Sequence, residues 1–430
     1  MHFSINRGGG QGAAPPGALE GCMKSRKFRK HSAKKEAGLK LCEFAARTVT
    51  LAALDIDAEG GEVPMFAPMG EATLARIRSC AAWVEFAVPE GFAKLKKIKG
   101  YVCRNAFCPV CAAYQARRDG LKLAAMMAAM QDLKRAAGAG GVAGLFGPEV
   151  AALPEVAKAA AQGAEFALAT LTAPNVGGAA LKAEERRYAK AFDLLVKNWL
   201  AREHGGHYLG YARKLEVTYN AERRITKAMW EGGGKYRAPG KWKYKRLGLG
   251  IGDPNPDYDT YHPHYHVLLA VAPGFFDGAG RPAVSREALL GKWRGLMGCP
   301  AITQVDIAKA GAGPGGGGSA ALEIAKYVAK DSDMLHSPKV FKVFYESLKG
   351  CKRLTMGGLF QVMHRLFKAG ELDRYVPPDE AAYKWALAYG WGGAGGPGGY
   401  APEGGRELSP EEAAKVRGMK YSEANDTEEF

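Results

Sequence analysis

The stretch that decides the fold is Tyr261-His262-Pro263-His264-Tyr265-His266-Val267-Leu268-Leu269-Ala270-Val271. It is a β-strand by composition, and its unbroken apolar second half is typical of a central strand that is buried on both faces. Because alternate side chains of a strand share a face, His262, His264 and His266 point to the same side, roughly 6.5–7 Å apart. Two imidazoles at this spacing can hold a divalent cation or contact a phosphate, whereas a single buried histidine is more often a hydrogen-bonded core residue.

A second predicted strand, Gly210–Asn220, places Glu216 among apolar residues. An acidic side chain that points into a sheet needs a cation or a metal ion as its partner. If this strand pairs with the histidine strand, Glu216 supplies the carboxylate of a His/His/Glu site. The alternative is a salt bridge from Glu216 to Arg213 or Lys214 on an exposed face.

Four cysteines gather ahead of these strands. Cys108 and Cys111 have the Cys-x-x-Cys spacing of a zinc knuckle, and Cys103 and Cys80 can complete a tetrahedral set. A redox pair or unliganded cysteines are the alternatives, but three thiols within nine residues on a basic loop favour structural zinc.

The charge of the chain favours a polyanionic partner. Its 430 residues carry a formal net charge of +16, and cationic side chains displace condensed counterions from a nucleic-acid backbone. No segment approaches the ~20 apolar residues that span a bilayer, and the first residues lack the apolar core of a secretory signal. We therefore expect a cytoplasmic protein without a membrane partner, in which cysteines are thiols or metal ligands.

A basic and aromatic segment, Lys235–Arg246, lies between the two strands. Such interleaving suits single-stranded nucleic acid, where cations follow phosphates and rings stack on bases, although a solvated hairpin has the same composition. The candidate DNA contacts in this segment are Lys241, Trp242, Lys243 and Tyr244.

The segment Ala321–Lys330 consists mainly of good helix formers. Glu323 and Tyr327 are four residues apart and would share one helix face. A carboxylate beside a phenol suits a tyrosine nucleophile with a glutamate base, although such pairs are common on surface helices. Further candidate DNA contacts are Lys326 and Lys330, which share another face, and Arg213.

Five blocks, taken in order, resemble the replication initiator proteins of rolling-circle plasmids, a branch of the HUH endonuclease superfamily named for its His-hydrophobe-His motif. The resemblance runs from about Arg76 to Gly358. The blocks are the Cys-Pro-x-Cys segment with Arg117-Arg118, Thr170–Asn175, Arg213–Asn220, His264-Tyr265-His266, and Glu323-x-x-x-Tyr327. The chain departs from the family pattern in its N-terminal arm, an Ala/Gly insertion at 138–163 and a Gly-rich tail.

The resemblance implies that His264, His266 and Glu216 bind Mg²⁺ or Mn²⁺, that Tyr327 is the nicking nucleophile, and that Glu323 activates water at termination. It implies a 5′-phosphotyrosine intermediate and a 3′-hydroxyl primer on plasmid origin DNA that is single-stranded at the nick, with host helicase and polymerase as partners. The alternatives are a single-tyrosine HUH transposase or mobilisation relaxase, a non-catalytic zinc-dependent nucleic-acid-binding protein, and a histidine-triad nucleotide hydrolase.

The expected fold is α+β: an antiparallel sheet of the HUH endonuclease (ferredoxin/RRM-like) type, flanked by helices, with a small zinc-binding segment. We expect a basic, Gly/Pro-rich, largely disordered arm at 1–75 and a Cys-rich zinc segment at 76–120. The HUH nickase domain is expected at 121–376, with the insertion at 138–163, followed by a Gly-rich disordered tail at 377–430.

Overall fold

The structure is a computed structural model that describes residues 12–52, 69–138, 140–233, 240–310, 321, 330–392 and 398–419, with the backbone alone at 16 and 47–52. Within these ranges, no helix combines the length and apolar character needed to cross a membrane. The chain divides into two compact units, which we call unit 1 (Met1–Arg118 with Pro377–Phe430) and unit 2 (Asp119–Val376). The division falls within α4 (Pro109–Gly138).

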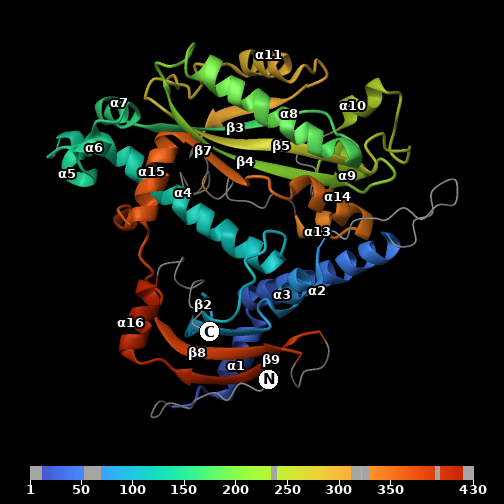
Figure 1. Ribbon diagram of the computed structural model, residues 1–430, viewed down its shortest axis with the longest axis vertical. Helices are drawn as coiled ribbons and strands as arrows, with labels where there is room; N and C mark the ends of the chain where they lie inside the picture. Colours follow the sequence, from blue (N-terminus) through green and yellow to red (C-terminus); the bar gives the residue numbers. More distant parts are fainter. Residues whose placement is uncertain are drawn as a thin grey trace. The chain divides into compact units, whose positions relative to one another are not determined.

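Unit 2 is built on a five-stranded antiparallel sheet in the order β6-β3-β5-β4-β7 (Figure 1). The histidine strand, β5, lies at its centre between β3 and β4, as its apolar second half predicts. The strands are β3 (Glu165–Thr172), β4 (Tyr208–Asn220), β5 (Thr260–Val271), β6 (Val305–Lys309) and β7 (Leu354–Gly358). The expected α+β fold with an antiparallel sheet is confirmed.

Helices cover one face of this sheet, the face that carries Tyr265. Tyr188 of α8 (Leu181–Leu194) lies edge-on to Tyr265 and to Trp293 of α11 (Arg286–Met297), with ring centroids 5.3 and 5.5 Å apart. In Figure 1 both helices lie on the same side of the sheet. The buried residues of α8 recur at intervals of three and four, so the helix presents one buried stripe to the strands.

The opposite face, which we call the histidine face, carries the even-numbered residues of β5 and packs against α4 and α15 (Leu359–Ala369). Ala212 and Leu268 are partners across β4 and β5 and are fully buried with Leu123 of α4 and Phe360 of α15. Figure 1 shows these helices on the side of the sheet away from α8. Each central strand is therefore buried on both sides, as its composition predicts.

Shorter elements complete unit 2. The predicted insertion folds into three short helices, and Val156 and Ala159 of the third join the buried cluster of the histidine face. These helices are α5 (Val142–Phe146), α6 (Pro148–Ala151) and α7 (Pro154–Gln162). The others are η1 (Gly178–Ala180), the π-helical η2 (Leu195–Leu200), α9 (Lys227–Glu231), α10 (Lys241–Arg246), α13 (Asp331–Met334), α14 (Pro338–Leu348) and η3 (Asp373–Tyr375).

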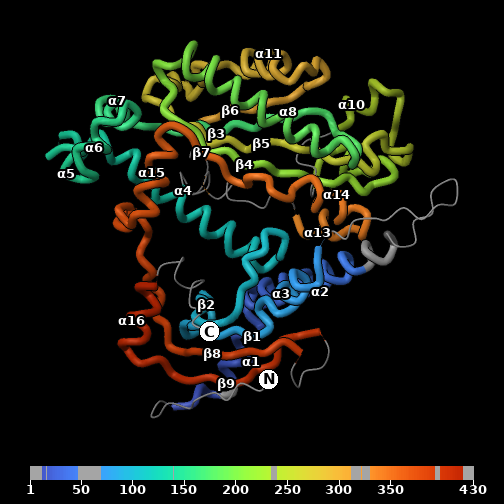
Figure 2. The backbone as a smooth tube through the Cα atoms, in the orientation of Figure 1, coloured from blue at the N-terminus to red at the C-terminus, as the bar shows by residue number. Residues whose placement is uncertain are grey.

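Unit 1 joins described segments from near the two ends of the chain, and in Figure 2 its strands β1 and β8 lie side by side. Its antiparallel sheet has the order β2-β1-β8-β9, so strands from the first hundred residues pair with strands from beyond residue 380. The elements are α1 (Pro16–Lys24), α2 (Arg26–Ala52), α3 (Glu71–Ser79), β1 (Trp83–Pro89), β2 (Lys96–Lys99), β8 (Tyr383–Trp391), β9 (Tyr400–Glu407) and α16 (Pro410–Gly418).

The described parts of 1–75 and 377–430 thus differ from the disordered arm and tail that we expected. In the lysine-rich α2, Phe28, Leu41 and Cys42 are buried, so the helix has an apolar face beneath its charged one. In β8, Leu387 and Tyr389 are likewise buried. Composition did not indicate these buried apolar faces, because the basic and glycine residues on one side of an element lower the average hydrophobicity of the whole segment.

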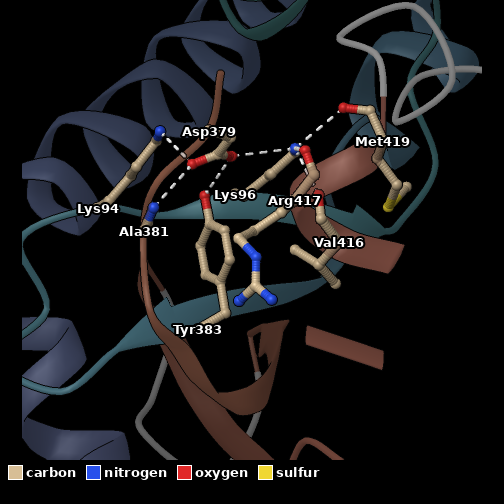
Figure 3. A network of polar contacts seen from close by, with 8 residues as sticks. All are labelled: Lys94, Lys96, Asp379, Ala381, Tyr383, Val416, Arg417 and Met419. Carbon is tan, nitrogen blue, oxygen red and sulfur yellow. Dashed lines mark hydrogen bonds and ion pairs between the residues drawn. The ribbon is translucent and has the colours of Figure 1, made fainter. Parts of the chain in front are cut away.

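A network of polar contacts links β2 to the C-terminal segment of unit 1 (Figure 3). The ammonium of Lys96 in β2 donates to Asp379 at 3.1 Å and to the backbone carbonyls of Val416 and Met419 at 2.6 and 3.0 Å. Lys94 and Tyr383 also donate to the Asp379 carboxylate, at 2.6 and 2.9 Å. Lys96 therefore donates to backbone carbonyls at and just beyond the C-terminal end of α16, where the carbonyls of a helix lack the partners found in its interior.

Candidate active site

A carboxylate and two imidazoles meet on the histidine face of unit 2. The register of β4 and β5 sets Glu216 opposite His264. Oε2 of Glu216 lies 3.0 Å from Nε2 of His266 and 3.5 Å from Nε2 of His264. The predicted pairing of these two strands is therefore confirmed, and we call the three residues the triad.

Burial and hydrogen bonding act against each other on the triad carboxylate. Glu216 is only 8% exposed, and this burial favours its neutral form. The contacts from His264 and His266 outweigh burial and hold the pKa of Glu216 well below its usual range. Glu216 is therefore an anion that faces two ring nitrogens.

The donor set of the triad fits a divalent cation. One oxygen and two nitrogen atoms, one from each residue, lie within 4.8 Å of one another. Nitrogen and carboxylate oxygen are ligands that suit divalent metal ions. Nδ1 of His264 also lies 3.3 Å from the carbonyl oxygen of His262, a contact of the kind that fixes the orientation of a metal-binding imidazole.

His262 lies beside the triad but outside it. Its ring stacks on that of His264, with centroids 5.3 Å apart. Burial, together with the neighbouring His264, lowers the pKa of His262 to about 4, so its ring is neutral near pH 7. It packs against a triad residue without approaching the carboxylate.

Unit 1 holds the second group of candidate ligands, Cys80, Cys103, Cys108 and Cys111, whose sulfur atoms lie within 4.8 Å of one another. The Sγ of Cys111 is 3.6 Å from the Sγ atoms of Cys80 and Cys103. Thiol hydrogen bonds from the other three hold the pKa of Cys103 far below its ordinary value, Cys108 contributing most. Four converging sulfurs fit a tetrahedral zinc ion.

The backbone around the cysteines is held by cationic side chains. Lys35 of α2, which is almost fully buried, donates to the carbonyl of Cys80 at 2.9 Å, and Arg76 donates to the carbonyl of Cys103 at 3.1 Å. Arg104 adopts a left-handed backbone (φ 54°), which turns the chain between Cys103 and the Cys-x-x-Cys pair. Cys80 thus reaches the cluster from the end of α3.

The basic and aromatic segment forms α10, which presents Trp242 to solvent with 68% of its surface exposed. The ammonium groups of Lys241 and Lys245 lie 5.7 and 5.8 Å from the Trp242 ring. Lys243 forms an ion pair with Asp257. These three lysines and the tryptophan make a cationic, partly apolar surface.

Two candidate DNA contacts have different environments from those we expected. Tyr244 is 5% exposed and packs in a small core with Met229, so its ring does not face solvent. Arg213 lies on the face opposite the triad, where its guanidinium is 4.5 Å from the ring centre of Phe192 and 4.7 Å from that of Tyr265. Arg213 and Glu216 are three residues apart, and an odd separation on a strand places side chains on opposite faces.

The candidate nucleophile Tyr327, with Glu323 and Lys326, lies outside the described residues. The described residues that precede and follow this segment, Ala321 and Lys330, belong to unit 2. Ala321 is fully buried in the cluster of the histidine face, and Lys330 is exposed at the start of α13. Asp333 of α13 accepts a hydrogen bond from the backbone N–H of Tyr219 at 3.2 Å.

A charged cluster beside the triad was not among the residues singled out from the sequence. Lys214 of β4 lies opposite His266, and its Nζ is 4.0 Å from Oδ2 of Asp119 in α4. Lys122 contacts the same carboxylate at 2.9 Å. Strand alternation indicates that Lys214 shares a face with Glu216, but the sequence holds no signal that α4 brings Asp119 to it.

The fold and the triad place the chain in the class of α+β proteins that carry two histidines and one carboxylate, a set that could hold a metal ion, on the central strands of an antiparallel sheet. A family model described as "Replication protein" matches residues 149–390, a stretch that contains the triad. The chain belongs to this replication protein family, whose members are Rep proteins that initiate plasmid replication.

Curated relatives are similar along most of their length. "Protein rep" of Staphylococcus aureus is 29% identical over 267 residues, which cover 62% of this chain and 86% of that protein. "Protein rep" of Streptococcus pneumoniae is 24% identical over 304 residues, covering 70% of this chain and 74% of the relative. "Protein rep" of Lentilactobacillus hilgardii is 22% identical over 309 residues, covering 70% and 77%. No solved structure matches the chain.

Proposed function

We propose that this replication initiator is a metal-dependent DNA nickase and strand transferase that cuts one strand at a plasmid origin. The observation that carries the proposal is the convergence of His264, His266 and Glu216 on two adjacent central strands. A buried anion faced by two imidazoles has little structural purpose in a sheet, whereas it is a suitable ligand set for an ion that binds phosphate. Membership of the replication protein family supports DNA as the substrate.

Tyr327 is the proposed nucleophile. Its phenol oxygen attacks the scissile phosphorus, and the bond from phosphorus to the 3′-oxygen breaks. The phenol proton passes to a base, and the departing 3′-oxygen takes up a proton from water to become a hydroxyl. A divalent ion held by the triad would neutralise charge on the phosphate and polarise it for this attack. The products are a 5′-phosphotyrosine bond and a 3′-hydroxyl that can prime synthesis.

The described residues that flank Tyr327 support this role. Ala321 belongs to the same buried cluster as Ala212, four residues before Glu216 on β4. Asp333 is hydrogen-bonded to Tyr219, three residues after Glu216. The segment that carries Tyr327 thus begins in the buried core of the histidine face and ends at a hydrogen bond to β4 close to the triad.

Glu323 is the proposed base that activates water when replication terminates. A single tyrosine leaves the second cleavage to another nucleophile, and a carboxylate can deprotonate water. A Glu323→Ala variant should nick normally yet release fewer finished single-stranded circles, and unchanged termination would remove this role.

The surface of α10 is a proposed contact for the single-stranded part of the origin. Trp242 can stack on a base while Lys241 and Lys243 approach phosphates, and α10 lies in the connection between the two strands of the triad. Lys326 and Lys330 are proposed contacts nearer the nucleophile. A host polymerase would then extend the 3′-hydroxyl while a host helicase unwinds the duplex, and zinc at the four cysteines would stabilise unit 1.

The test is nicking of a supercoiled plasmid that carries the gene for this chain with its flanking DNA. The chain should nick one strand with Mg²⁺ or Mn²⁺ and should not nick after chelation. Tyr327→Phe should abolish nicking with nearly unchanged DNA binding, whereas Tyr375→Phe, at a tyrosine that donates to Asp132, should nick normally. Absence of metal-dependent nicking by the unmodified chain would overturn the proposed function.

A further inference from the structure

The connection between β4 and β5 carries an exposed apolar surface. It consists of residues 221–259, of which the structure describes 221–233 and 240–259. Among all described residues, the large hydrophobic side chains that are exposed lie here: Trp242, Leu247, Ile251 and Tyr258. Apolar side chains scattered singly over a surface need no explanation, whereas their concentration in one short stretch indicates a binding surface.

A small core beneath the connection holds this surface in place. Leu249 packs against the core, while Leu247 and Ile251, two residues to either side of it, are 56% and 53% exposed. The buried members of the core are Ile225, Met229 and Tyr244. The chain therefore folds one aliphatic side chain inward and leaves its two neighbours of the same kind in solvent.

Ile251 lies in a tight turn. The backbone N–H of Asp253 donates to the carbonyl of Gly250 at 3.3 Å, and the Asp253 carboxylate accepts a hydrogen bond from the N–H of Gly250 at 2.7 Å. Gly252 closes the turn with a positive φ of 95°, a conformation that favours glycine. Ile251 is thus the second residue of a turn that is fixed from both ends.

The charges of the connection favour a nucleic acid over a protein as the partner. Lys243, Lys245 and Arg246 of α10 are exposed, whereas Asp253 and Asp257 are half-buried. Asp257 pairs with Lys243, and Asp253 is engaged in the turn. Lysine is depleted in protein–protein interfaces, but it is the side chain that a phosphate backbone attracts.

The connection leaves the sheet close to the triad. It begins after Asn220, four residues beyond Glu216, and ends before Thr260, four residues ahead of His264. At a rise of about 3.3 Å per residue, the triad lies roughly 13 Å along the strands from this end of the sheet. Figure 1 shows α9 and α10 at the same end. DNA that has one phosphate at the triad can therefore reach the connection within a few nucleotides.

We propose that Leu247 and Ile251 form an apolar wedge that enters a base step of duplex origin DNA beside the nick site and opens it. The wedge rests on the proposed function, because its ligand is the DNA that the triad would cut. Aliphatic side chains inserted between base steps unstack them, and phosphate contacts from neighbouring cations offset the cost. A base released in this way can stack on Trp242.

The test maps unstacked thymines with potassium permanganate on a supercoiled plasmid that carries the gene for this chain with its flanking DNA. The Tyr327→Phe variant is used so that no nick forms, and it should make thymines at one site reactive. Adding Leu247→Ser and Ile251→Ser should lower this reactivity at least about tenfold. Plasmid binding should fall less than about threefold, because phosphate contacts supply most of the affinity.

The matched control replaces the same two residues by methionine, which keeps the apolar bulk and should keep the reactivity. Both residues are exposed, so neither pair of substitutions should change the unfolding temperature. The wedge would be overturned if the methionine pair also lost the reactivity, if binding fell in parallel with reactivity, or if Tyr327→Phe opened no site.

Unchanged reactivity in the serine pair would overturn the wedge as well. If the serine pair also lowered the molar mass in light scattering, the surface would be a contact between copies of the chain. Failure of the unmodified chain to nick a plasmid whose thymines do become reactive would overturn the proposed function but not the wedge.

Discussion

Glu216 is the side chain on which the triad depends, because it is the only one of the three that carries a formal negative charge. Its two imidazole neighbours hold it ionised in spite of burial. Removing that charge while keeping the shape of the side chain should leave the fold intact and remove the main attraction for a cation.

We predict that Glu216→Gln lowers the affinity of the chain for Mn²⁺ at least about tenfold, measured by isothermal titration calorimetry. Nicking should fall at least in proportion. Glu165→Gln, at a half-buried glutamate that pairs with Lys309, is the matched control and should bind Mn²⁺ as the unmodified chain does. Unchanged affinity in Glu216→Gln would show that the triad is not the metal site.

For single residues, the sequence predicted the position of a side chain wherever alternation along one strand is sufficient to determine it. Alternation along β5 was sufficient to place His264 and His266 together. It was also sufficient to place Arg213 away from Glu216, a consequence that the expectation of a DNA contact overlooked. The burial of Tyr244 could not be foreseen, because it depends on Met229 and Trp230, which pack on it from another short helix.

Among the elements, the cysteine cluster of unit 1 follows largely from the spacing of cysteines along the sequence. Cys103, Cys108 and Cys111 lie on one loop and the first turn of α4, so the sequence predicts their grouping. Cys80 joins them from the end of α3, where Lys35 holds its carbonyl. The carbonyl contact links the cluster to α2, an element that composition alone did not reveal.

We predict that Cys108→Ser reduces bound zinc from about one ion per chain to near zero, measured by atomic absorption. Because structural zinc contributes directly to folding free energy, the unfolding temperature should also fall. Cys299→Ser, at a cysteine outside the cluster, should keep its zinc. A zinc-loaded Cys108→Ser variant with unchanged unfolding temperature would contradict the assignment.

The network around Asp379 gives unit 1 a defined dependence on pH. Burial raises the pKa of this carboxyl, but hydrogen bonds from Lys94, Tyr383 and Lys96 outweigh burial and bring it to about 2. The ordinary pKa of an aspartate is about 3.9, so the folded state favours the ionised form. The stabilisation is therefore complete above about pH 4 and is lost as the pH falls through about 2.

We predict that Asp379→Asn lowers the free energy of unfolding by about 2 kcal/mol at pH 6. The difference from the unmodified chain should shrink below pH 4 and vanish near pH 2, in denaturant titrations at each pH. Glu403→Gln, an exposed substitution in β9, should show no such dependence. A difference that persisted at pH 2 would mean that Asp379 acts through something other than its charge.

In the whole molecule, the sequence predicted the strands and helices of unit 2 but not the strand pairing of unit 1. Unit 2 followed from periodicity, because its strands and helices alternate along one continuous stretch. Unit 1 did not, because β1 pairs with β8, and partners such as Trp83 and Gly390 lie about 300 residues apart in sequence. Pairing at that separation is specified by tertiary packing and leaves no local pattern.

The family match lies mainly in unit 2 and extends into β8 of unit 1. The stretch 149–390 covers the triad and most of unit 2 but none of the four cysteines. The proposed chemistry therefore resides in unit 2, whereas the four cysteines that could hold a metal ion lie in unit 1, which is built from segments near both ends of the chain.

The most direct test of the account is the identification of the covalent intermediate by mass spectrometry. The chain is incubated with Mn²⁺ and a single-stranded oligonucleotide that spans its nick site, digested with protease and nuclease, and searched for a nucleotide-bearing peptide. We predict a 5′-phosphate adduct on Tyr327 that is absent after chelation and in Glu216→Gln. An adduct on another residue, or nicking without any adduct, would contradict it.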